Sequence, residues 1–193
     1  RIAMTSSLES DYLYAQQHPE SRQEFIDSID LEEAKTYINK VVYRGNHDLS
    51  YIFLKKLNPL MRIGLSPFYR LWKEQRSSII VYPEAFSSEL IHNKGDFLSL
   101  LIDHEGTHAK DSFKDPWSML IGMTEIESRV AEDSWRRLYN KVDAKEQRAI
   151  YHQIQNFDRR GCSQQFRETI LAKHQQYKEF LSHRENLSYR ELG

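Results

Sequence analysis

The sequence predicts a mainly helical α+β protein with a single domain over residues 1–193. Apolar residues recur at helical spacing through most of the chain, and only 7 Gly and 5 Pro interrupt it. The stretch SSIIVYP at 77–83 is the clearest strand, because it is short, β-branched and bounded by proline. Hydrophobic residues make up 39% of the chain, which is enough for a packed core.

The first half of the chain is predicted to form three helices. Two cover residues 8–18 and 22–43, and the second ends at Gly45–Asn46. It is predicted from the apolar residues Phe25, Ile29, Ala34, Ile38, Val41 and Val42. The third, DLSYIFLKKL, begins after an Asp48 cap and stops before Pro59. Residues 60–76 give mixed signals. We interpret residues 1–45 as an N-terminal helical arm or a propeptide-like segment.

The second half contains the predicted strand and then only helices. Asp96 is expected to cap the helix that carries FLSLLIDHEGTHAKD, residues 97–111. From about 117 to 189 the pattern indicates three helices, divided near 141–143 and at Gly161. The C-terminal helices of the domain are placed at 143–193.

Charge and cysteine content exclude several classes of protein. The formal net charge is −1, with acids and bases interleaved, so no nucleic-acid or anionic-membrane surface is expected. The apolar runs are too short for a membrane span, and a soluble chain is expected. The single cysteine, Cys162, excludes an intramolecular disulfide and a thiolate-rich zinc site. Any metal is therefore expected to be held by histidines and carboxylates.

The sequence HEGTH carries the strongest chemical signal. On a helix, His104 and His108 are four residues apart and share a face with Phe97, Leu100 and Leu101, so their imidazoles converge. The H-E-x-x-H spacing is typical of a zinc site in which the intervening Glu105 acts as general base. A purely structural pair of buried histidines is the alternative reading.

With the strand SSIIVYP before it and the acidic TEIESRVAED after it, this motif resembles the zincin metallopeptidases. The metzincin subgroup would need Gly at 111 and His or Asp at 114, where this chain has Asp111 and Lys114. The gluzincins instead take a Glu from a following helix, and eighteen residues separate His108 from Glu127, as in aminopeptidase-N-like members. The chain has no GAMEN-like exopeptidase motif, and its size is closer to the compact minigluzincins.

The acid that completes the site is predicted to be Glu127. On a helix it shares a face with Met123, Val130 and Ala131, whereas Glu125 falls on a polar stripe with Ser128, Arg129, Glu132 and Arg136. A third ligand elsewhere in the chain is the alternative. Asp111 is a candidate to orient a ligand imidazole, or it merely accepts hydrogen bonds from solvent. Tyr139 and His152 are candidates to stabilise an oxyanion.

The resemblance implies a zincin-like domain with a small sheet beside the site helix, where the strand at 78–82 is predicted. In related folds an edge strand there binds an extended peptide by strand addition. The implied function is hydrolysis of peptide bonds in a peptide or protein substrate, with one Zn²⁺ per chain held by His104, His108 and Glu127. Two alternatives remain, a catalytically silent zinc-binding or interaction domain on the same scaffold, and a metal-free helical partner-binding domain. The compartment, the cleavage preference and the oligomeric state are left open, since a start at Arg1 fits a processed or trimmed precursor.

Overall fold

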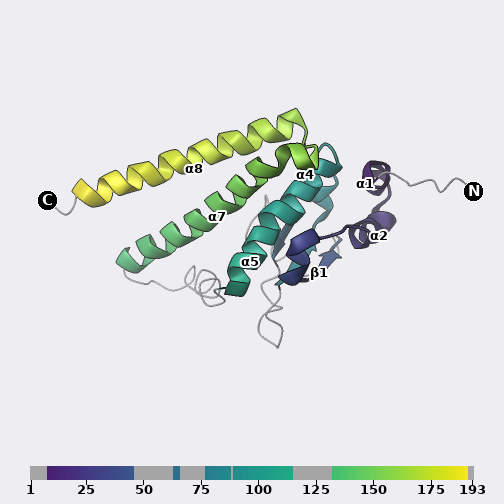
Figure 1. Ribbon diagram of the computed structural model, residues 1–193, viewed down its shortest axis with the longest axis horizontal. Helices are drawn as coiled ribbons and strands as arrows, with labels where there is room; N and C mark the ends of the chain where they lie inside the picture. Colours follow the sequence, from purple (N-terminus) through teal and green to yellow (C-terminus); the bar gives the residue numbers. More distant parts are fainter. Residues whose placement is uncertain (1–7, 46–62, 66–76, 88, 115–131, 191–193) are drawn as a thin grey trace, which may run out of the picture.

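A computed structural model describes residues 8–45, 63–65, 77–87, 89–114 and 132–190. Over these residues the chain is a mainly helical α+β protein with a small sheet, as the sequence predicts. Two long helices, α7 (Glu132–Arg160) and α8 (Gln164–Arg190), lie on one side of the helix that includes α5 (Gly106–Lys114; Figure 1). The N-terminal helices lie at the opposite end of the molecule from the C-terminus (Figure 1). None of the helices in the described ranges is long and apolar enough to cross a membrane. The helix predicted over 48–57 lies outside the described residues.

The N-terminal region consists of short elements. These are α1 (Leu8–Gln17), the 3₁₀ turn η1 (Pro19–Ser21), α2 (Arg22–Asp27), the 3₁₀ turn η2 (Glu32–Thr36) and strand β1 (Ile38–Tyr43). The prediction of a helix over 8–18 is confirmed, but that of one helix over 22–43 is wrong. Ile38 and Val41 are both buried in β1 because an irregularity in the pairing follows Ile38 and shifts the alternation of faces by one residue. Their helix-like spacing therefore comes from a bulged strand.

The sheet has the order β1-β3-β2. Strand β3 (Ser77–Val81) is its centre, pairing parallel with β1 and antiparallel with β2 (Ile63–Leu65). The predicted strand is thus confirmed within one residue, but its edges are occupied by neighbours, so it is not an edge strand that accepts a peptide. Among the described residues, β2 is the edge strand that contacts the site helix.

The helix that carries the HEGTH sequence begins at Lys94. It runs without a break through α4 (Lys94–Leu98), a π-helical segment η5 (Ser99–Glu105) and α5 (Gly106–Lys114), here together called the site helix. Its N-cap is Asn93, whose Oδ1 accepts from the backbone of Asp96 at 2.9 Å, so the predicted Asp96 cap is wrong. The fully buried Asp96 carboxylate instead accepts from the backbone of His92 and from Ser163.

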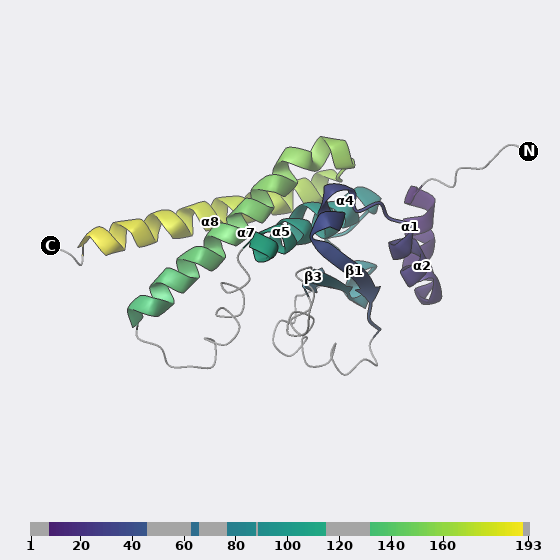
Figure 2. The same ribbon diagram turned by 60° about the horizontal axis from the view of Figure 1, so that its bottom comes forward.

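The two C-terminal helices form a hairpin, and Figure 2 shows them beside the site helix on the side away from the sheet. Helix α7 (Glu132–Arg160) is continuous, so the division predicted near 141–143 is wrong. Lys, Ala, Glu, Gln and Arg, which follow in KEQRA, are strong helix formers. The break at Gly161 is confirmed, because Gly161 has φ +69° and separates α7 from α8 (Gln164–Arg190).

Two apolar clusters hold these layers together. In the first, the rings of Tyr12, Phe25, Phe86 and Phe97 pack with centroid distances of 5.4 to 6.1 Å. The second lies at the turn between α7 and α8 and contains Ile150, Phe157, Cys162, Phe166 and Ile170. The N-terminal helices therefore pack into the core that supports the site helix. The single-domain assignment over 1–193 and a propeptide-like role for 1–45 stay predictions.

A buried ion-pair network joins η2, the site helix and the end of α7. The Arg160 guanidinium donates through Nε and Nη2 to the two carboxylate oxygens of Asp103, each at 2.9 Å. Its Nη1 donates to Glu32 at 2.7 Å, and Arg159 also donates to that carboxylate. The Asp103 and Arg160 side chains are 1% and 5% exposed. Removing one partner of such a buried pair costs about 3–5 kcal/mol, because the other charge is left uncompensated.

The network predicts an acid-dependent stability contribution from Glu32. Its hydrogen bond and charge interaction with Arg160 lower the pKa of Glu32 from its usual value, against the opposing effect of burial. A carboxylate with a lowered folded-state pKa stabilises the fold above its unfolded pKa, and the contribution disappears as the pH falls through the folded pKa. Glu32→Gln should therefore lower the urea midpoint at pH 7, and its difference from wild type should shrink on acidification through roughly pH 5 to 3.

The control is Glu33→Gln, which removes the neighbouring carboxylate outside the network. A Glu32→Gln difference that stays constant across this pH range would show that the charge of Glu32 does not contribute.

Candidate metal centre

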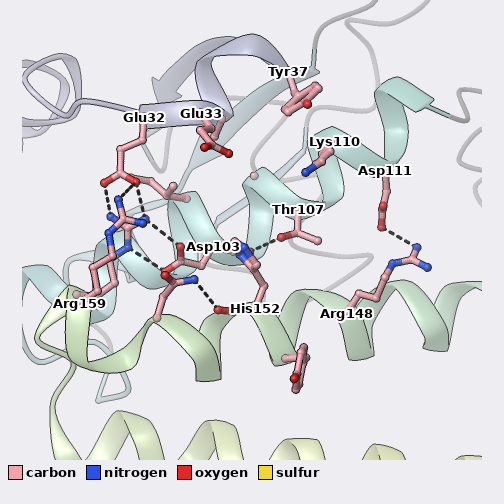
Figure 3. Close-up of a pocket in the computed structure, with 16 residues that line it drawn as sticks. Glu32, Glu33, Tyr37, Asp103, Thr107, Lys110, Asp111, Arg148, His152 and Arg159 are labelled. Atoms are coloured by element: carbon pink, nitrogen blue, oxygen red, sulfur yellow. Dashed lines mark hydrogen bonds and ion pairs between the residues drawn. The ribbon is translucent and has the colours of Figure 1, made fainter.

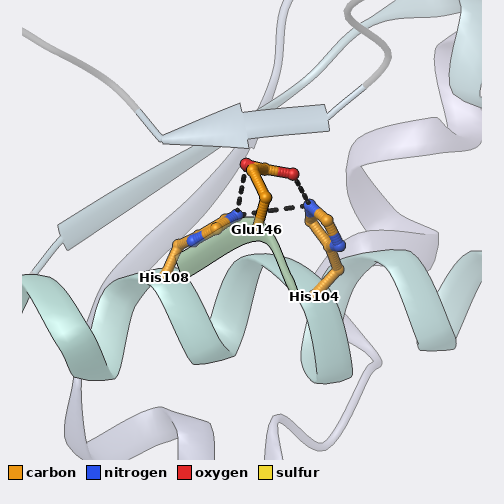
Figure 4. Close-up of side chains that lie close together, drawn as sticks. All are labelled: His104, His108 and Glu146. Atoms are coloured by element: carbon orange, nitrogen blue, oxygen red, sulfur yellow. Dashed lines mark hydrogen bonds and ion pairs between the residues drawn. The ribbon is translucent and has the colours of Figure 1, made fainter. Parts of the chain in front are cut away.

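Three side chains from two helices place their ligand atoms together. His104 and His108 project from the same side of the site helix, and Glu146 reaches them from α7 (Figure 4). The two Nε2 atoms are 3.3 Å apart, and the Glu146 carboxylate lies 3.0 Å from His108 and 3.6 Å from His104. Two ligands of a tetrahedral zinc, each at about 2.0–2.1 Å from the metal, lie about 3.3 Å from one another. The spacing of these three ligand atoms therefore fits one metal ion.

The protonation states of the two histidines differ. Burial and the neighbouring charge of His108 lower the pKa of His104 to about 4, so this imidazole is neutral near pH 7. Burial opposes a charge on His108 as well, but its hydrogen bond to Glu146 and the nearby carboxylates raise its pKa. Glu146 is held as a carboxylate, because the contact with His108 outweighs burial and lowers its pKa to about 2. A metal ion entering the group would replace the proton shared by His108 and Glu146.

Gln153 orients the ring of His104. Its Oε1 lies 3.0 Å from His104 Nδ1, and its side-chain amide also reaches Ser99 Oγ at 3.4 Å. An amide oxygen can only accept, so Nδ1 donates and the Nε2 lone pair faces Glu146 and His108. Partners of this kind fix the tautomer and the ring angle of a metal ligand. Gln153 is fully buried, and the sequence analysis did not name it.

Glu105 lies beside the three side chains without being one of them. Burial and the charge of Glu146 raise its pKa to about 7, while His108 and Lys173 act in the opposite direction. The charges of His108, Glu146 and Lys173 are thus close enough to Glu105 to change its pKa. A carboxylate of this pKa is suited to exchanging a proton near neutral pH.

Glu146, Gln153 and Arg160 form a row along α7. They are seven residues apart, and that spacing keeps side chains on the seam that faces a partner helix. The first contacts the histidines, the second contacts His104 and the third contacts Asp103. The apolar Ala149, Ile150 and Phe157 lie on the same face and are buried. This row of polar side chains at heptad spacing among apolar ones was the sequence signal that could have identified Glu146.

The predicted ligands and candidate residues are placed as follows. His104 and His108 come together as expected, whereas Glu127 lies outside the described residues, as does Glu125. Tyr139 belongs to α7, but its side chain is not described. Asp111 accepts from the exposed Arg148 at 2.8 Å, and His152 is exposed and is not one of the three side chains that converge. Glu127 therefore stays a prediction, and Glu146 is the acid that the structure brings to the histidines.

A cavity of about 500 Å³ lies on another side of the site helix, against η2 and α7 (Figure 3). It is lined by Asp111 and His152 but not by His104, His108 or Glu146. Its charged groups largely neutralise one another, in the pairs Asp111–Arg148, Glu32–Arg159 and Asp103–Arg160. The candidate metal centre is thus separate from this cavity, whose ion pairs connect the elements around it.

Comparison of the chain with protein-family models, with curated proteins and with solved structures finds no match. The interpretation of the site therefore rests on its own residues and geometry.

The contact between Gln153 and His104 predicts an effect on metal affinity. Gln153→Leu keeps the approximate volume of a fully buried side chain but removes the acceptor for Nδ1. Loss of such a partner typically weakens metal binding by about 10–100-fold. Zinc dissociation constants, measured by competition with a chromophoric chelator, should show this loss. Gln175→Leu, which removes an exposed amide paired with Glu179, should bind zinc like wild type. Unchanged affinity in Gln153→Leu would mean that this amide does not orient the ligand.

Proposed function

We propose that the chain is a zinc-dependent hydrolase of peptide bonds, with His104, His108 and Glu146 as metal ligands and Glu105 as general base. The observation that carries the proposal is the convergence of the three ligand atoms, all within 4.8 Å of one another, beside a carboxyl group of raised pKa. Structural histidine pairs do not require a half-buried acid from a second helix and an amide that fixes one tautomer. The resemblance of HEGTH to the zincin motif supports the same conclusion.

The donor set also fits zinc by its chemistry. Two imidazole nitrogens and one carboxylate oxygen are the ligands of catalytic zinc sites, which keep a further position for water. When bound there, zinc would lower the pKa of its water and polarise the carbonyl of a peptide bond. The same three donors are also found around non-haem iron, so elemental analysis of the purified protein is part of the test.

Proton transfer is assigned to Glu105. With its pKa near 7, the carboxylate is able to accept a proton at neutral pH and to give it up again to a leaving amine. Burial raises this pKa most, and the charge of His108 is the largest opposing effect. His104 and His108 have the different role of holding the metal, because their Nε2 atoms face one another and Glu146.

Substrate placement is supported by the position of β2. This strand contacts the π-helical segment that contains His104 and Glu105, and it runs antiparallel to β3. Among the described strands it has a partner on one edge only. An extended peptide adding to that edge would gain backbone hydrogen bonds without requiring a particular sequence. A peptide or protein is therefore the substrate class that we propose.

The identity of the third ligand is tested by zinc affinity. Glu146→Ala and Glu127→Ala are compared, because the first acid contacts both histidines and the second was predicted from its spacing to His108. Loss of a direct ligand should weaken binding by more than the roughly 100-fold that marks the loss of an outer partner. We expect this of Glu146→Ala. The exposed Glu168→Ala serves as control. Wild-type affinity in Glu146→Ala combined with a large loss in Glu127→Ala would reassign the ligand to Glu127.

The division between metal binding and chemistry is tested at Glu105. Glu105→Gln should keep one zinc per chain and the wild-type circular dichroism spectrum, because Glu105 is not a ligand in the proposed set. Cleavage of a peptide library should fall by at least ~10²-fold, the usual contribution of a positioned general base.

If wild type binds zinc but cleaves no peptide in the library, the silent zinc-binding domain becomes the better description. If wild type and His104→Ala both contain no metal, the site itself is refuted.

A further inference from the structure

The ligand His104 directly follows Asp103, the most deeply buried acid of the ion-pair network. Asp103 is 1% exposed, and both of its carboxylate oxygens accept from Arg160. A two-pronged contact between a guanidinium and a carboxylate fixes orientation as well as distance. The backbone of the turn that presents His104 is therefore held by α7, the same helix that supplies Glu146.

The three contacts of the α7 row are geometrically coupled. Glu146 and Arg160 are fourteen residues apart, so about 21 Å of rigid helix separates them at 1.5 Å per residue. A shift of α7 along the site helix would move Glu146 away from the histidines by the same amount as it moved Arg160 away from Asp103. Because Arg160 donates to both carboxylate oxygens of Asp103, it opposes such a shift.

Glu32 closes the network from the third element, η2. It is a non-glycine residue with φ +53°, a strained conformation that persists only where the surrounding contacts impose it. In this conformation its carboxylate accepts from Arg160 Nη1 and Nη2 and from Arg159. The guanidinium of Arg160 thus donates to two carboxylates, those of Asp103 and Glu32.

The segment held in this way is π-helical. Residues Ser99–Glu105 form η5, and the helix returns to α geometry at Gly106. Segments of π-helix are rare and occur frequently at functional sites, since they change the direction in which the following side chains point. The relative directions of His104, in η5, and His108, in α5, depend on this transition. Asp103 lies within η5, one residue before His104. Fixing the Asp103 side chain therefore constrains the backbone at His104 directly.

We propose that Arg160, held by Glu32, is a positioning residue of the metal centre, which sets the register of α7 against the π-helical turn and so the spacing of Glu146 from His104 and His108. This inference rests on the proposed metal site and adds to it a role for residues that do not contact the metal. It differs from a general stabilising role, because it concerns the geometry of the ligands as well as the stability of the fold.

The experiment compares Arg160→Lys with Arg148→Met. Arg160→Lys keeps a positive charge beside Asp103 but loses the two-pronged contact with Asp103. It also loses the guanidinium nitrogens that donate to Glu32. Arg148→Met removes the pair with Asp111, which joins the same two helices at the surface and not beside His104. Each protein, prepared metal-free, is titrated with Co²⁺, whose visible absorption reports coordination geometry. Zinc affinity is then measured by chelator competition, and the urea midpoint of the metal-free protein is measured in parallel.

We expect Arg160→Lys to bind zinc about 10-fold more weakly or worse and to show an altered Co²⁺ spectrum, as after the loss of an outer partner of a ligand. Arg148→Met should stay within about twofold of wild type, with an unchanged spectrum. A simple loss of stability would move the urea midpoint but leave the spectrum of the bound ion as in wild type.

Wild-type affinity and spectrum in Arg160→Lys would overturn the proposal, and so would equal changes in Arg148→Met. If Arg160→Lys does not fold, Glu32→Gln is the deciding variant, because it leaves the Arg160–Asp103 pair and weakens only its outer support. An unaltered spectrum and affinity in Glu32→Gln would then overturn the proposal. If wild type itself binds neither Co²⁺ nor zinc, the failure lies in the proposed metal site, and the positioning role falls with it.

Discussion

The contact between α7 and the site helix is the interaction on which the rest of the site depends. Its apolar part consists of Ala149, Ile150 and Phe157, which are buried against the site helix and α8 and remove a continuous strip from water. Its polar part is the row of Glu146, Gln153 and Arg160, which contact, respectively, the histidine pair, His104 alone and Asp103 of the site helix. Apolar burial draws the helices together without fixing their register, whereas directional polar contacts select one register. Without this contact the two histidines would lose Glu146.

Burying so many charged groups in one contact has consequences for the chemistry. Taking a carboxylate out of water is unfavourable unless cations and hydrogen-bond donors surround it. Asp103 meets this requirement through Arg160, and Glu146 meets it through His108. Glu105 does so less completely, and its pKa rises to about 7. The under-compensated carboxyl group is thus the one to which we assign proton transfer. The same environment leaves Glu146 ionised and the pKa of Glu105 near neutrality.

Sequence and structure agree where local signals were decisive and differ where distant residues decided. The strand at 77–81, the helix with HEGTH and the break at Gly161 follow from β-branched residues, helical spacing and a glycine with positive φ. Residues 38–43 were predicted as helix, because a bulge in β1 gives its buried residues a spacing of three. The cap was placed at Asp96 instead of Asn93, because both are good capping residues and the choice depended on Ser163, 67 positions away.

By itself the sequence determined the chemical type of the candidate site. The histidine pair, the glutamate between them and the lack of any cysteine cluster are properties of residue type and short-range helical geometry, which need no knowledge of the fold. Only the tertiary structure decided which acid meets the histidines, which amide orients His104 and which cation holds Asp103. These partners lie 38 or more residues away, and many acids on helices have equally suitable local patterns. The packing of α7 against the site helix selects among them, because the register that buries its apolar residues also pairs its charged side chains.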